Sequence, residues 1–404
     1  MKLTTFALVV SCAALTAPAY AQGDSADPSG AARLRLGPLS LNPSVALTNI
    51  GVDDNVFNRA RSDDPQRDFT MTVTPKADWS VRLGRSFLTG AVKEDLVYYQ
   101  RFASERSINS SNQVGLRVPL NRLTLALGTT FVNKRDRPGF EIDARSRHTQ
   151  ADHEASAELR AFGKTFVAIT GRRSTVAFER DAVFMDSNLR IQLNRRVTVA
   201  GDSARHEITP VTSLTLEVER GNDRFEFSPL RDSNSTSVTG GVAFKPRTLL
   251  SGSAAFGYRH FRSIAADVPD FKGMTARVDV AARILGSMKL GVQVQRNLQY
   301  SYNLDQPYYL LTGATVSLAR GLYGPVELAG RMGAHSLAYR GRLGAETALP
   351  DRTDSVRTIG GTIGYRLGHG MRLGFNVDKQ TRLSEEAQRQ YGGVRYGTSV
   401  TYGF

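Results

Sequence analysis

The last fourteen residues, Tyr391–Phe404, read YGGVRYGTSVTYGF. From residue 394 onward, the even-numbered positions carry Val, Tyr, Thr, Val, Tyr and Phe, whereas the odd-numbered positions carry Arg, Gly, Ser, Thr and Gly. Successive side chains of a β-strand point to opposite faces of the strand. The stretch is therefore predicted to be a strand with one apolar, aromatic face and one small or polar face.

A closing amphipathic strand that ends on an aromatic residue resembles the last strand of bacterial outer-membrane barrels. In that resemblance, Tyr402 and Phe404 form the signal that the barrel-assembly machinery recognises. The strand returns to the periplasm, with Tyr396 and Val400 against lipid and Arg395 toward the lumen.

The amino terminus has the features of a secretory signal peptide. Lys2 supplies a positive charge, residues 6–15 form an apolar run, and Ala19-Tyr20-Ala21 offers a cleavage site. The apolar run is too short for a transmembrane helix. Residues 1–21 are therefore predicted to be removed. A lipoprotein signal ending at Cys12 is the less favoured alternative, because the apolar run continues past it.

Composition narrows the class of protein. Cys12 is the only cysteine, so the mature chain forms no internal disulfide. The chain has 52 basic and 38 acidic residues, and only nine of the basic residues are lysines, which leaves 43 arginines. Arginine binds carboxylate and phosphate groups bidentately. Because the signal peptide argues against nucleic acid as a partner, we expect outer-membrane lipid and lipopolysaccharide, or an acidic solute. The simpler alternative is arginines that snorkel at the interfaces and pair with acids.

The strand pattern recurs along the chain, most clearly in residues 69–82. There Phe, Met, Val, Pro, Ala, Trp and Val alternate with Thr, Thr, Thr, Lys, Asp, Ser and Arg. Trp79, the only tryptophan, falls where an interfacial aromatic girdle would place it. Similar alternation appears at 114–120, 123–131, Leu189-Ile191-Leu193, 250–258, 274–280, 288–294, 310–318, 359–367 and 371–377.

Connections between these runs alternate in length. Short links are predicted at residues 83–85, 119–122, 163–164, 209–210, 245–247, 286–287, 319–321 and 368–370. Longer polar segments are predicted at 53–67, 101–110, 135–147, 222–233, 265–270, 303–307, 340–354 and 381–389. Short turns at one rim and long loops at the other are typical of outer-membrane barrels, with the short turns in the periplasm.

These observations predict an all-β, transmembrane, antiparallel outer-membrane β-barrel of about eighteen strands. Sixteen strands is the alternative, because residues 188–206 contain no clear turn. The first strand is expected to begin near Pro43, within a barrel domain of residues 41–404. Residues 22–40 are expected to be a short periplasmic segment, too short for a plug domain. A barrel of this size encloses an aqueous channel.

A narrower resemblance lies near the mature amino terminus. Residues 41–47 (LNPSVAL) lead into residues 51–58 (GVDDNVFN), and Phe244–Arg247 form a Phe-x-Pro-Arg turn. These features resemble the β-barrel porins often encoded with exopolysaccharide operons. The resemblance implies an outer-membrane barrel with a role in polysaccharide passage or envelope assembly, and export components as partners. It brings no catalytic residues.

Candidate chemistry is sparse. His148 and His153 are five residues apart, which places them on opposite faces of a strand and argues against a metal site. Ser111, Ser156 and Ser237 have no partner histidine that the sequence can supply, although a serine nucleophile needs one. We therefore expect no catalytic residue, no metal and no cofactor. An outer-membrane hydrolase is the least favoured alternative.

The first long loop is acidic. Asp53, Asp54, Asn55, Asp63 and Asp64 supply oxygen ligands of the kind that Ca²⁺ takes. Their spacing matches no known calcium loop, so a solvated acidic loop is favoured and cation binding stays open.

Basic residues also recur on the face predicted to line the lumen. They are the candidates for pore selectivity, namely Lys76, Arg82, Arg117, Arg160, Arg190, Arg277, Lys289, Arg331, Arg366, Arg372 and Arg395. Acids on the same face are fewer, which predicts a preference for anions. The alternative is a balanced ladder of cross-strand ion pairs.

The sequence therefore predicts a passive outer-membrane channel for anionic or saccharide-type solutes, as an accessory of exopolysaccharide export. The runner-up is a structural or assembly barrel whose lumen is occluded by loops.

Overall fold

The computed structural model describes residues 32–246, 249–344, 351–368 and 370–403. The signal peptide, Cys12 and Phe404 lie outside these residues. Half of the wall consists of β2 (Leu39–Asp53), β3 (Asp68–Leu83), β4 (Ser86–Tyr99), β5 (Ser107–Pro119), β6 (Leu123–Asp136), β7 (Ser146–Phe162), β8 (Thr165–Phe178), β11 (Arg195–Thr209) and β12 (Thr212–Phe225). The other half consists of β13 (Ser233–Phe244), β14 (Leu250–Ser263), β15 (Phe271–Ile284), β16 (Met288–Tyr300), β17 (Tyr308–Gly321), β18 (Val326–Arg340), β19 (Thr353–Gly368), β20 (Met371–Leu383) and β21 (Tyr391–Tyr402).

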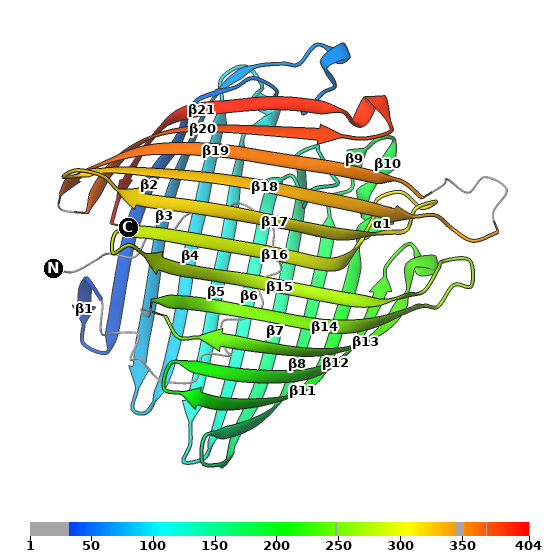
Figure 1. Cartoon of the computed structure of the whole chain (residues 1–404). Helices are drawn as coiled ribbons and strands as arrows, with labels where there is room; N and C mark the ends of the chain where they lie inside the picture. The colour runs from blue at the N-terminus through cyan, green and yellow to red at the C-terminus, as the bar shows by residue number, and fades with distance from the viewer. Residues whose placement is uncertain (1–31, 247–248, 345–350, 369, 404) are drawn as a thin grey trace.

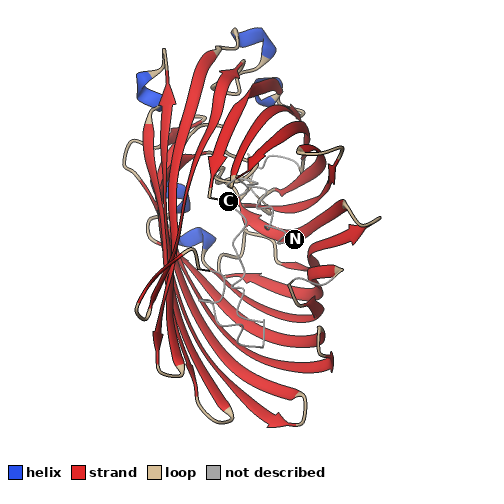
Figure 2. Ribbon diagram, turned by 90° about the vertical axis from the view of Figure 1, so that its left-hand side faces the viewer, coloured by secondary structure: helices blue, strands red, loops and turns tan. Residues whose placement is uncertain are grey.

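These eighteen strands form a closed antiparallel barrel (Figure 1). Each pairs with its neighbours in the chain, and β2 pairs with both β3 and β21, which closes the ring. Figure 2 shows the strand wall curving around the interior. The predicted fold and strand number are confirmed. Sixteen strands, the alternative, is wrong.

Side chains alternate between two environments along each strand. On β12, Leu214, Leu216 and Val218 are exposed on the outer face, whereas Glu217 and Glu219 lie between them on the inner face. Large apolar side chains that remain exposed are costly in water but stable against acyl chains. The outer face therefore carries the lipid-facing band, and the inner face is polar.

Several strand ends differ from the predictions. The first strand begins at Leu39 rather than near Pro43, and it pairs with an unpredicted strand β1 (Leu34–Leu36). Residues 319–321, predicted as a turn, are the end of β17, and the turn follows them. Gly321 suggested a turn in the sequence. In the structure, the inward and outward alternation of β17 continues through it, and the ladder with β18 extends to Gly321.

The prediction of a strand at Leu189-Ile191-Leu193 is wrong. These residues form the short helix α1 (Leu189–Leu193), within a long loop that also holds β9 (Val183–Phe184) and β10 (Ser187–Asn188). The Asn188 side chain accepts a hydrogen bond from the backbone N–H of Ile191, which caps the helix. Leu189 and Leu193 share a helix face and are buried, whereas Ile191 is exposed. Apolar residues at positions i, i+2 and i+4 fit the two-residue period of a strand, and the first and last of them also fit one turn of a helix. Only tertiary packing decides between the two structures.

The remaining short helices are η3 (Arg61–Asp63), η4 (Ala103–Glu105), η5 (Pro229–Arg231) and η6 (Ala387–Arg389), all in the long loops. Among the described residues, no helix is long and apolar enough to cross a membrane.

Candidate functional site

The lumen has a ring of basic side chains at its periplasmic end. Each lies on the inner face of a strand, within three residues of a periplasmic turn, and together they are Arg82, Arg117, Arg160, Arg283, Lys289, Arg366 and Arg372. Six of the seven are among the predicted lumen residues, and Arg283 is an addition. We call this set the periplasmic ring.

Few acids balance the periplasmic ring. Arg366 and Arg372 both pair with Glu327, the former at 2.7 Å. In the described part of the chain, Arg117, Arg160 and Lys289 have no carboxylate within ion-pair distance. Two more inward acids near this rim, Glu158 and Glu207, pair with Arg205, each at 3.0 Å. Within the ring, two cations share Glu327 and three have no acid, so the ring presents a net positive charge at the entrance from the periplasm.

Farther into the lumen, the predicted cations are mostly paired. Lys76 Nζ lies 2.7 Å from Asp78 Oδ2, and Arg331 Nη2 lies 2.8 Å from Asp378 Oδ1. Arg395 pairs with Asp53 at the extracellular end of the seam between β2 and β21. Arg277 lies in electrostatic range of Arg172, Glu217 and Glu219. The alternative of a ladder of ion pairs therefore describes this middle part better than a cationic wall does.

Arg190 is not on the barrel wall. It lies on α1, where its guanidinium stacks over the ring of Phe227 at 4.9 Å. Its assignment to the lumen was wrong because the strand on which it depended is a helix.

The extracellular mouth is covered by loops that meet across it. The β16–β17 tip (residues 301–307) contacts the β6–β7 loop (residues 137–145), although these two hairpins are eight strands apart around the ring of eighteen. The β8–β11 loop (residues 179–194) and the β20–β21 loop (residues 384–390) complete the layer. We call these four loops the extracellular cap.

Glu141 is the central contact of the cap. Its carboxylate accepts a hydrogen bond from the Ser301 hydroxyl at 2.6 Å and one from the backbone N–H of Tyr302 at 3.1 Å. The side chain is 2% exposed. Burial raises the pKa of this carboxyl above its usual range, despite the nearby charges of Arg389 and Arg382.

Two buried arginines hold the cap in place: Arg382 links it to the wall, and Arg389 links three of its loops. The Arg382 guanidinium, on β20, pairs with Asp354 on β19 and with Asp143 in the cap, the latter at 3.1 Å. Arg389 pairs with the same Asp143 at 3.3 Å and donates to the Tyr302 hydroxyl at 3.1 Å. Both side chains are at most 1% exposed. A buried charge that loses its partner is strongly destabilising, so this network fixes the position of the cap.

Apolar packing covers both faces of the β16–β17 tip. On one side, Leu298 and Tyr308 are buried against Phe261 and Val268. On the other, Tyr309 and Leu311 are buried against Tyr339, with Phe140 of the cap at the edge. The hydrogen-bonded ladder between β15 and β16 ends at Ala276 and Arg296. Beyond this point, β16 continues its ladder with β17 alone, up to Tyr300 and Tyr308.

Sequence reasoning did not find the cap residues. Glu141, Asp143, Arg382 and Arg389 lie in predicted polar loops or at their borders, where charged residues are ordinary. Nothing in the local pattern distinguishes a charge that will be buried from one that will be solvated.

The first three residues of the acidic loop are bonded to the wall, whereas Asp63 and Asp64 are exposed. Asp53 pairs with Arg395, Asp54 accepts a hydrogen bond from the backbone N–H of Val394, and Asn55 bonds the backbone of Arg59 and Gly392. Across the described ranges, no three His, Cys, Asp or Glu side chains are placed to hold a metal ion.

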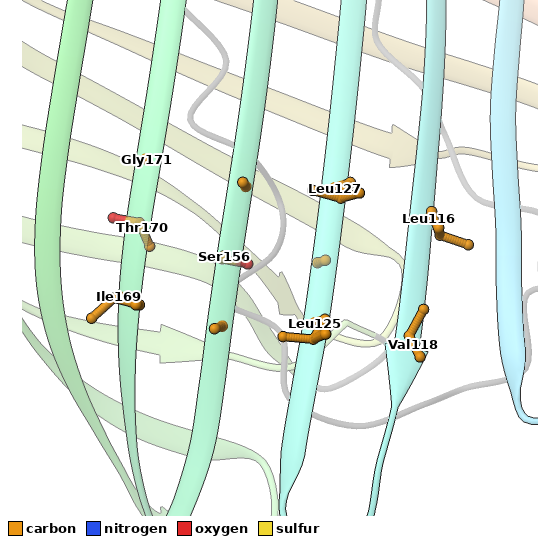
Figure 3. A pocket seen from close by; sticks show the side chains of 11 residues that line it. Leu116, Val118, Leu125, Leu127, Ser156, Ile169, Thr170 and Gly171 are labelled. Atoms are coloured by element: carbon orange, nitrogen blue, oxygen red, sulfur yellow. The ribbon is translucent and has the colours of Figure 1, made fainter.

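A groove lies on the outer side of β5–β8 (Figure 3). The residues that line it include Leu125, Leu127, Ala155, Ala157 and Ile169. The leucine and isoleucine side chains belong to the outer, lipid-facing set. The groove therefore faces acyl chains and is not an entrance to the lumen.

Comparison with known proteins agrees with this architecture. The family model described as "Putative beta-barrel porin 2" matches residues 27–404. No curated protein matches the chain.

Similar solved structures include three outer-membrane proteins of Pseudomonas. OpdK of Pseudomonas aeruginosa, solved with vanillate, is 12% identical, with a TM-score of 0.47 over 90% of this chain and 98% of that one. OccK2 (OpdF) of the same organism, in complex with glucuronate, is 13% identical, with a TM-score of 0.49 over 90% and 97%. A BenF-like porin of Pseudomonas fluorescens Pf-5 is 11% identical, with a TM-score of 0.49 over 91% and 98%.

The closed barrel, its lipid-facing band and the family match over residues 27–404 lead to one conclusion: the chain belongs to the Putative beta-barrel porin 2 family and is an outer-membrane, porin-like β-barrel channel.

Proposed function

We propose that the barrel conducts anionic, saccharide-type solutes that enter from the periplasm, and that it serves as an accessory of exopolysaccharide export. The periplasmic ring carries this proposal. Basic side chains around one mouth of a pore raise the local concentration of anions and lower the barrier to their entry. Signal-peptide export through residues 1–21, and recognition of Tyr402 and Phe404 by the barrel-assembly machinery, belong to the same proposal.

Neutral polar groups support the saccharide part of the proposal. Between the charged pairs, the inner face carries hydroxyl and amide side chains such as Ser203, Ser237, Thr239, Gln293 and Gln295. Hydroxyls and amides both donate and accept hydrogen bonds, as sugar hydroxyls do. A lumen of this kind replaces the water around a sugar without holding it tightly.

Planar-bilayer conductance tests the ring. We expect anion-selective current steps, and we expect Arg117→Glu with Lys289→Glu to shift the reversal potential toward cation selectivity. Arg122→Glu is the matched control, because Arg122 lies in the adjoining periplasmic turn outside the lumen. A double variant that keeps the wild-type ion preference would refute the anionic proposal.

Solute flux tests the saccharide class. Proteoliposomes should release an oligomer of uronic acids faster than a neutral glucose oligomer of equal length. Equal release rates for the two oligomers would contradict this function. So would a barrel that releases neither oligomer after its cap has been opened.

The extracellular cap favours a second candidate, a barrel that is closed and structural. Its buried contacts cross the mouth, which a freely open pore does not require. A purified, folded barrel that never conducts, with the cap intact or opened, would support this candidate instead.

A further inference from the structure

The outer face of β8 and β11–β15 carries a row of basic side chains at the upper edge of the lipid-facing band. On β12, the outward series Leu214, Leu216 and Val218 is followed by Arg220 and then Arg224. On β8, Arg173 follows Val167 and Ile169 in the same way. On β15, Lys272 comes directly above Met274. With Arg196 and Arg262, these residues form what we call the outer basic belt.

Strand register brings cations of the belt directly opposite one another. Arg196 on β11 lies directly opposite Arg224 on β12 in the strand register. Directly opposed side chains on one face have Cβ atoms about 5 Å apart, and like charges there are destabilising. Such pairs are stable when an anion lies between them.

Protein acids do little to balance the belt. Arg224 has one carboxylate nearby, Asp232, at 3.9 Å, and its guanidinium also donates to the backbone oxygens of Asp223 and Ser233 and to Asn234 Oδ1, each at 2.8 Å. Arg173, Arg196 and Arg220 have no ion pair among the residues that the structure describes. Arg173, Arg196 and Arg220 are therefore open to an anion from outside the chain.

The position of the belt along the membrane normal indicates which anion it meets. It begins at the first polar position above the apolar band, at the extracellular end, which is the depth of the headgroups in the outer leaflet. Arginine forks bind phosphate bidentately, and most of the belt is arginine. On the opposite wall, the outward cations Arg357 and Lys379 face Thr381 and Ile359 in register, and not another cation.

We propose that the outer basic belt is a binding site for the phosphorylated headgroup of an outer-leaflet lipid of the lipid A type. One phosphate lies beside Arg196, with Arg173 on β8 and Arg224 on β12 at either side, and Arg220 lies four residues nearer the apolar band on β12. The acyl chains lie along the apolar band below. This site is separate from the lumen, so it stands whether or not the barrel conducts anionic saccharides.

The test uses the refolded full-length barrel and bis-phosphorylated lipid A, with retention measured by native mass spectrometry. We expect the variant R173Q/R196Q/R220Q/R224Q to bind about tenfold or more weakly, because four charge-assisted contacts are removed. R357Q/K379Q on the opposite wall is the control and should bind within about twofold of wild type. R196K/R224K keeps the charge but loses the fork, so it should bind with intermediate strength.

Two further arms separate the sources of affinity. Lipid A without its phosphates should bind wild type as weakly as the quadruple variant binds the intact lipid. Inorganic phosphate at millimolar concentration should fail to displace bound lipid A, since the acyl chains contribute the rest. Equal binding of dephosphorylated lipid, full displacement by free phosphate, or wild-type binding by a correctly folded quadruple variant would each overturn the proposal. Heat-modifiability on a gel reports correct folding.

Discussion

The extracellular and periplasmic ends of the lumen use the same residue types in opposite ways. Beneath the cap, Arg382 on β20 and Asp354 on β19 are completely buried and depend on each other. Nearer the periplasm, Arg331 and Asp378 pair with similar geometry, but their side chains are 33% and 39% exposed. Water screens the second pair and not the first, so ion pairs build a fixed structure at one end and a charged, wet surface at the other.

The largest effect is expected from breaking the buried network. Arg382→Met should destabilise the closed cap by about 3–5 kcal/mol, because Asp354 and Asp143 are left as buried charges without their shared partner. Single-channel conductance and protease cleavage of the cap loops should both rise. Lys379→Met, on the outer face of the same strand, is the control and should leave both unchanged. Unchanged conductance and cleavage in Arg382→Met would show that the cap does not depend on this network.

A smaller effect is expected at the tip of β16–β17. Ser301→Ala removes the hydroxyl that donates to Glu141 and should cost the closed cap about 1–3 kcal/mol, the penalty for an unsatisfied buried acceptor. Hydrogen exchange should quicken in residues 301–307 and leave the strand wall protected. Exchange that quickens equally throughout the barrel would mean that the tip and the wall are not separate units.

Acidity should strengthen the cap. Because burial raises the pKa of Glu141, the closed cap holds a proton that the opened, solvated loop releases. Closed-state stability is therefore complete below the ordinary carboxyl pKa and is lost as pH rises through the raised value. Arg382, Arg389 and Arg231 face this carboxyl and stay charged throughout.

Open probability should thus increase with pH in this window, and Glu141→Gln should make the profile shallower. Burial also raises the pKa of Asp143 in the same network, so Asp143 should account for the slope that remains. A profile of the same slope in Glu141→Gln would assign the titration to another group.

The smallest effect is expected in the wet half of the lumen. Arg331→Gln should change barrel stability by at most about 1 kcal/mol, since its pair with Asp378 is partly exposed and screened. The midpoint of urea unfolding in detergent measures this. A loss comparable with that in Arg382→Met would remove the distinction between the two ends.

Local pattern was sufficient for most of the wall. The two-residue period of β12 or β3, with turn residues between runs, identifies a strand and its lipid-facing side without knowledge of its neighbours. It failed at Leu189–Leu193, where two periods fit the same three apolar residues. Local pattern also could not tell which lumen cations are neutralised by an acid. Arg366 and Arg331 occupy equivalent inward positions in the sequence pattern, and only the structure shows where their acids lie.

The sequence by itself therefore determined the barrel. Each strand meets lipid on one face and water on the other, so its side chains must alternate in polarity whatever the neighbouring strands are. Only the tertiary structure decided that the mouth is covered. The bond between Glu141 and Ser301 joins residues 160 positions apart and exists because the closed ring brings two distant hairpins face to face. Burial of a charge depends on what lies across the lumen, and no local pattern contains that information.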